Sequence, residues 1–141
     1  MKALHLFAAA VQIWSSGSIK QDSASLTSAA EAKGIEGKTL GSFGNYSTAV
    51  WRRAKSGEAE LHKTKTDLLI IEEGEATLIY GGTIPDGHST SAVEIRGSSI
   101  RGGETRKLGP GDVVRIPAGT PHQFILARGQ TVSYFAVKLA R

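Results

Sequence analysis

The stretch Gly111-Asp112-Val113-Val114-Arg115-Ile116-Pro117-Ala118-Gly119-Thr120-Pro121-His122 decides the fold expected for this chain of 141 residues. Gly111 and Asp112 predict a turn, and residues 113–116 after it, apolar except for Arg115, predict a short strand. Pro117 and Gly119 predict a second tight turn, which brings His122 to the start of the next strand. We therefore expect the His122 side chain to point into the space between two sheets.

A second stretch, upstream of the first, carries further residues that can bind a metal. Residues 60–67 read Glu60-Leu61-His62-Lys63-Thr64-Lys65-Thr66-Asp67, and Gly74 follows after six intervening residues. The two stretches together resemble, in order and spacing, the two motifs of the cupin superfamily. The resemblance covers residues 40–140. Glu60 stands where the first His of the motif is usual, Asp67 where Glu is usual, and Leu126 where Asn is common.

The resemblance implies an all-β fold, the double-stranded β-helix or jelly-roll barrel, with one divalent metal ion inside it. The implied metal ligands are Glu60, His62, Asp67 and His122. The change at position 60 alters this ligand set, whereas the change at Leu126 is harmless because the usual Asn is not a ligand. The chain has no cysteine, so imidazole and carboxylate groups must bind the metal. These groups favour Mn, Fe or Zn, with Ni and Co as further candidates.

Alternation of apolar and polar residues supports the barrel independently of the motifs. Nine short strands are expected, at 46–54, 58–62, 67–73, 75–80, 92–96, 104–108, 112–116, 122–127 and 132–139. Residues 81–91, rich in Gly and Ser, are expected to form a surface loop. Segments such as 68–71 are apolar on both faces, so a second copy of the chain should cover one sheet and make a homodimer.

The N-terminal region is expected to lie outside the barrel. Residues 1–20 have the outline of a signal or leader segment, and residues 21–38 form an arm with a short helix over 27–33. Ser25 or Thr27 could cap that helix, and Gly34 would end it. The cupin barrel domain would then span residues 39–141. A real leader would make the protein secreted or periplasmic, and without one it would be cytoplasmic.

Strand parity indicates which side chains share the barrel interior, because side chains on a strand repeat their direction every two residues. Glu60 and His62 share one face, as do Asp67, Leu69 and Ile71 on the next strand. His122, Phe124 and Leu126 share a face on the strand after the Pro117 turn. Two imidazoles and two carboxylates can therefore converge in front of an apolar wall.

Several of these residues keep alternative interpretations. Glu60 could bind the metal, act as a catalytic general base, or pair with Lys63 or Lys65 at the surface. Asp67 could simply be the turn residue that starts its strand. Arg52 and Arg53 are adjacent, so only one can point inward, where it would suit an anionic substrate.

Two classes of function remain. The first is a small metal-dependent enzyme acting on a small molecule, such as a dioxygenase, isomerase or lyase. The second is a non-catalytic cupin that binds a metal or small ligand as a sensor. The formal charge of +4 is spread along the chain without interleaved aromatic residues, which argues against nucleic acid as a partner. The apolar N-terminal run is too short and too interrupted to span a membrane.

Overall fold

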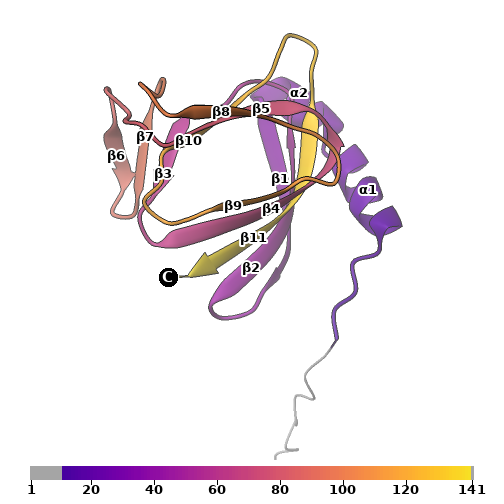
Figure 1. Cartoon of the computed structure of the whole chain (residues 1–141). Helices are drawn as coiled ribbons and strands as arrows, with labels where there is room; N and C mark the ends of the chain where they lie inside the picture. Colours follow the sequence, from indigo (N-terminus) through magenta and orange to yellow (C-terminus); the bar gives the residue numbers. More distant parts are fainter. Residues whose placement is uncertain (1–10, 141) are drawn as a thin grey trace, which may run out of the picture.

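Two antiparallel sheets face each other across one core in the computed structural model, which describes residues 11–140 (Figure 1). The five-stranded sheet has the order β1 (Ile35–Ser42), β2 (Tyr46–Arg53), β11 (Val132–Ala140), β4 (Lys65–Gly74) and β9 (Val113–Ile116). The six-stranded sheet has the order β6 (His88–Ser91), β7 (Glu94–Gly97), β3 (Ala59–His62), β10 (His122–Ile125), β5 (Ala76–Tyr80) and β8 (Glu104–Leu108). This arrangement confirms the predicted jelly-roll barrel.

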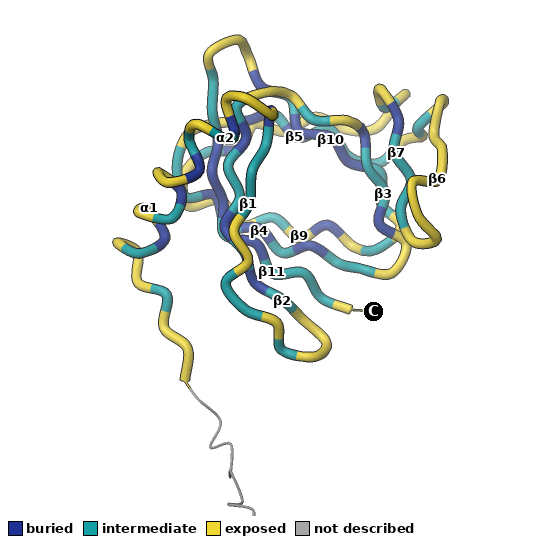
Figure 2. The backbone as a smooth tube through the Cα atoms, turned by 180° about the vertical axis from the view of Figure 1, so that it is seen from behind, coloured by how far each residue is buried: buried dark blue, intermediate teal, exposed yellow. Residues whose placement is uncertain are grey.

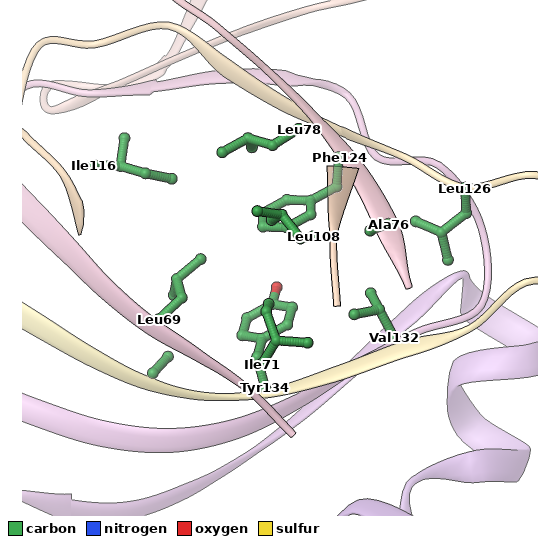
Figure 3. Packing of buried hydrophobic residues seen from close by; sticks show 11 residues of the cluster. Leu69, Ile71, Ala76, Leu78, Leu108, Ile116, Phe124, Leu126, Val132 and Tyr134 are labelled. Carbon is green, nitrogen blue, oxygen red and sulfur yellow. The ribbon is translucent and has the colours of Figure 1, made fainter. Parts of the chain in front are cut away.

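The core lies between the sheets because alternate residues of the strands turn their apolar side chains inward. On β4, Leu69 and Ile71 are buried, while the alternate residues Leu68 and Ile70 are half-buried. Figure 3 shows side chains of the two sheets meeting in this core. Its buried members are Leu69, Ile71, Ala76, Leu78, Leu108, Ile116, Phe124, Leu126, Val132, Tyr134 and Ala136. The predicted apolar wall of residues 69, 71, 124 and 126 is part of it.

Two strands form where the sequence predicted none. β1 has no clear alternation, and Gly37 lies in it opposite Trp51 of β2. A Cβ atom at Gly37 would lie 2.4 Å from the Trp51 ring, so the strand makes room for a large neighbour instead of contributing a side chain. β6 lies inside the predicted loop 81–91, and all four of its residues are exposed at the sheet edge (Figure 2). Pairing with a neighbouring strand, rather than burial, explains both.

The N-terminal region contains two helices, α1 (Ser16–Ser25) and α2 (Thr27–Lys33). The predicted helix over 27–33 is confirmed, and Gly34 ends it with a φ of 94°. The predicted caps were wrong. The hydroxyls of Ser25 and Thr27 donate hydrogen bonds to carbonyl oxygens of α1, and the N-cap residue of α2 is Leu26. The sequence also missed α1, whose N-cap is Ser15. Residues 1–10 of the expected leader lie outside the described residues.

These helices pack against the outer face of the five-stranded sheet. Ile19 and Leu26 form a buried cluster with Val50 of β2, and Phe135 of β11 packs against it. The chain itself therefore covers part of the apolar face that was expected to need a second copy, and the homodimer stays a prediction. β1 begins at Ile35, earlier than the barrel boundary expected at residue 39. None of the described helices is long and apolar enough to cross a membrane.

Candidate metal centre

β3 and β10 bring three possible metal ligands together. Glu60 and His62 are two residues apart on β3 and share a face, and Glu60 lies directly opposite His122 of β10. One ligand atom from each of the three residues lies within 4.8 Å of the others. Both imidazoles are buried, with 8% of His62 and 3% of His122 exposed. The positions predicted from the two motifs thus meet inside the barrel.

The carboxylate of Glu60 lies between the two imidazoles. Glu60 Oε2 is 3.6 Å from His62 Nε2 and 3.5 Å from His122 Nε2. The turn after Pro117 also connects the two motifs, because the Gly119 N–H donates a hydrogen bond of 2.7 Å to the His62 carbonyl. Gly119 has a φ of 82°, a conformation that glycine adopts without strain.

Asp67 approaches the same place from the opposite sheet, on β4. Its Oδ2 is 3.5 Å from His62 Nε2, and its Oδ1 is 3.4 Å from Lys138 Nζ of β11. Asp67 therefore lies beside the group of three without belonging to it. Its role as a metal ligand stays a prediction.

Both imidazoles are oriented by a partner on the far side of the ring. His122 Nδ1 lies 3.0 Å from the Thr120 carbonyl oxygen, which can only accept, so Nδ1 carries the proton and donates it. His62 Nδ1 lies 2.9 Å from Glu94 Oε1, which also accepts. In the neutral form, both Nε2 lone pairs then point toward the Glu60 carboxylate. Metal-binding histidines commonly have such an outer partner.

The sequence did not predict Glu94 or Arg96 of β7, which support the site from behind. Glu94 lies opposite His62 and Arg96 opposite Glu60 in the pairing of β3 with β7. Arg96 Nη1 is 3.0 Å from Glu60 Oε1, and Arg96 Nη2 is 3.4 Å from Glu94 Oε1. Their alternation at 94 and 96 is visible in the sequence, but the pairing that brings them to the site is not.

The chemistry of this group fits a divalent cation. Arg96 and Lys138 pair with the outer oxygens of Glu60 and Asp67. With both imidazoles neutral, the two Nε2 lone pairs and the inner carboxylate oxygens face one another without a donor, an arrangement that needs protons or a metal ion between the acceptors. Ligand atoms about 2.1 Å from a tetrahedral ion lie about 3.4 Å apart. The separations of 3.5–3.6 Å around His62 Nε2 and Glu60 Oε2 are close to that value.

The surroundings of Glu60 keep it ionised. Burial alone would raise its pKa, but the neighbouring side chains of His122 and His62 and the charge of Arg53 outweigh burial and hold the pKa far below the ordinary range. A carboxylate this weakly basic is a good acceptor for a cation and a poor general base. The ligand role of Glu60 is therefore better supported than the catalytic one.

From the lowered pKa of Glu60 we predict how the stability of the fold depends on pH. A carboxylate with a lowered folded-state pKa stabilises the fold above its unfolded pKa of about 4.3, and this contribution is lost as the pH falls below it. In chelator-treated protein, we expect wild type to melt above Glu60→Gln at pH 6, with the difference shrinking by pH 3. Glu75→Gln, an exposed residue, is the control. A difference that grows at low pH would contradict the prediction.

A cavity of about 390 Å³ opens at this centre. The three grouped residues and Asp67 line it together with apolar side chains, including Trp51, Leu69, Phe124 and Ala136. Of the two adjacent arginines, Arg53 lines the cavity, whereas Arg52 hydrogen-bonds to Ser23 of α1 on the outer face. The site therefore combines a possible metal centre with space for a small molecule.

Solved structures share this fold. The polyketide cyclase RemF from Streptomyces resistomycificus is 21% identical with a TM-score of 0.56, covering 77% of this chain and 67% of that one. A cupin superfamily protein from Desulfitobacterium hafniense is 17% identical with a TM-score of 0.54, covering 77% and 80%. The DMSP lyase DddQ from Ruegeria pomeroyi is 17% identical with a TM-score of 0.55, covering 77% and 48%. The chain has the cupin fold. Neither a protein-family model nor a curated protein matches the sequence.

Proposed function

We propose that this cupin binds one divalent metal ion through Glu60, His62 and His122, with Asp67 as a fourth ligand, and acts as a metal-dependent enzyme on a small molecule. One observation carries the metal assignment. Two buried Nε2 atoms, each oriented by a partner at Nδ1, converge on an ionised carboxylate without a donor between them. Arg96 pairs with the outer oxygen of Glu60, but the two Nε2 lone pairs and the inner oxygen have no partner unless a cation lies between them.

The ligand set narrows the metal and the chemistry. Imidazole and carboxylate ligands suit Mn, Fe or Zn, with Ni and Co as further candidates. A bound divalent ion would supply Lewis-acid polarisation of a substrate oxygen. The chain would contribute the orientation of the two imidazoles through Thr120 and Glu94, and an apolar wall around the open side of the cavity. A dioxygenase, isomerase or lyase activity is compatible with this site.

The solved structures that share this fold include enzymes, which supports an enzymatic function without indicating a reaction. RemF is described as a polyketide cyclase and DddQ as a DMSP lyase, so the fold serves enzymes with different substrates. One observation favours the alternative, a non-catalytic metal or ligand sensor: the low pKa of Glu60 removes the carboxylate expected to act as the base. The two functions differ in whether the protein turns over a substrate, and a small-ligand sensor would not need the metal.

The experiment that tests the metal site is reconstitution. Chelator-treated protein would be loaded with Mn, Fe, Ni, Co and Zn in turn, desalted, and analysed for bound metal. We expect about one ion per chain for at least one of these metals. His88→Ala, which removes an exposed histidine of β6, should retain the same amount. If wild type retains none of the five metals, the proposed function is wrong.

A further inference from the structure

Arg53 is a buried cation that forms no ion pair with the proposed metal ligands. Only 6% of it is exposed, and it lines the same cavity as Glu60, His62 and His122. No carboxylate within residues 11–140 forms an ion pair with it. Three of the other basic side chains that line the cavity have carboxylate partners, because Arg96 pairs with Glu60, Lys138 with Asp67 and Lys33 with Glu36. The fourth, Lys55, is exposed to solvent. A buried charge is costly without an anionic partner, so Arg53 is poised to receive one.

The contacts of Arg53 hold the guanidinium in place and leave one end of it available. Its Nε donates a hydrogen bond of 3.1 Å to the Tyr134 hydroxyl, and its Cζ lies 4.8 Å from the centre of the Phe124 ring. A guanidinium has five N–H donors, and this hydrogen bond uses one of them. Stacking on Phe124 fixes the plane of the group. The two Nη atoms thus form a preoriented fork.

Gly57 makes room for that fork. A Cβ atom at position 57 would lie 2.4 Å from Arg53 Nη1, so any larger residue there would push the guanidinium aside. The Gly57 N–H donates to the Phe124 carbonyl, which ties the glycine to the strand that carries the stacking ring. The position of Arg53 is therefore built by several parts of the fold and is not that of a mobile surface side chain.

We propose that Arg53 binds the carboxylate group of a small organic anion and holds its other end toward Glu60, His62 and His122. Two parallel N–H donors match the two oxygens of a carboxylate. A single unpaired arginine among the acidic side chains Glu58, Glu60, Asp67 and Glu94 suits one negative charge better than the two of a phosphate monoester. The apolar side chains of the cavity would contact the carbon skeleton. This inference deepens the proposed function by naming its substrate class, and it concerns the same cavity.

Binding of simple carboxylates tests the inference. The monocarboxylates acetate and benzoate would be titrated into chelator-treated and Zn-loaded protein, with the Arg53 Nε–H resonance followed by NMR. Benzyl alcohol and inorganic phosphate serve as neutral and dianionic comparisons. We expect at least one carboxylate to shift that resonance, and to bind more tightly than either comparison.

Variants then assign the binding to Arg53. Arg53→Met removes the charge but keeps an apolar stem against Phe124, and should weaken carboxylate binding at least tenfold. Arg52→Met removes the same charge from the opposite face and should leave binding unchanged. Gly57→Ala keeps the charge but displaces Nη1, and should also weaken binding. If Arg53→Met does not fold, Arg53→Lys is used in its place. It keeps the charge but lacks the two parallel donors, so carboxylate binding should again be weaker.

The outcomes separate this inference from the metal site. Equal carboxylate affinity in Arg53→Met and Arg52→Met, no carboxylate binding in either metal state, or tighter binding of phosphate would overturn it. In each of those cases a protein that still retains metal leaves the proposed function standing. Conversely, carboxylate binding that depends on Arg53 in a protein retaining no metal would support the inference alone.

Discussion

His122→Ala is expected to reduce metal affinity at least about 100-fold while the barrel stays folded. The variant removes one of the two nitrogen ligands in the group. Loss of an outer partner of a ligand already costs about 10–100-fold in metal affinity, so loss of the ligand itself should cost at least as much. The fold should survive because the Pro117 turn is held independently, by the hydrogen bond from Gly119 to the His62 carbonyl.

Metal titration of the variant and of wild type, monitored by calorimetry, would measure this effect. His88→Ala is the matched control, because it removes an exposed imidazole from the same sheet. His122→Gln keeps more of the buried volume and guards against loss of the fold, which circular dichroism would check. Wild-type metal affinity in a folded His122→Ala protein would refute the role of His122.

Gly74→Ala should lower the free energy of unfolding by about 3 kcal/mol or more, because strain and overlap act together. Gly74 ends β4 with a φ of 76°, a region that residues with a Cβ atom rarely adopt. A Cβ atom there would lie 1.9 Å from the carbonyl oxygen of Thr131, and this oxygen belongs to the backbone. Neither atom can move without disturbing the pairing of β4 with β11, in which Val132 lies opposite Gly74. Urea denaturation would measure the loss.

Gly44→Ala separates the two causes. Gly44 has nearly the same φ, 75°, but nothing lies within 4 Å of a Cβ atom built on it. Its substitution should therefore cost only the backbone strain, about 1 kcal/mol. Equal losses in the two variants would mean that the approach of Thr131 contributes nothing at Gly74.

The resemblance of the two motifs, together with local features of the sequence, predicted the barrel and the side chains that meet in the group of three. The spacing from Gly111 to His122 encodes a turn, a strand and a turn, each formed by neighbouring residues. Alternation on β3 and β10 then places Glu60, His62 and His122 on inward faces. These predictions succeeded because turns and strand parity depend on residues close in sequence. The helix over 27–33 succeeded for the same reason.

Other features depend on contacts between distant segments. β1 and β6 lack a pattern of their own and form by pairing with β2 and β7. α1 carries few apolar residues, and the cluster of Ile19 with Val50 appears only once the helix lies on the sheet. Pairing and docking of this kind leave no local signal, so the sequence alone missed these elements.

The same distinction between local and long-range features applies to the residues of the site. Residue types at 60, 62, 67 and 122 were readable as possible ligands, but the outer partners Glu94 and Arg96 required the register of β3 against β7. The sequence indicated that only one of the adjacent residues Arg52 and Arg53 could face inward. The structure shows that Arg53 faces the cavity and that Arg52 contacts Ser23 of α1 on the outer face. The two-residue repeat of a strand predicts which side chains share a face. Only the pairing and packing of the strands decides which face is the cavity.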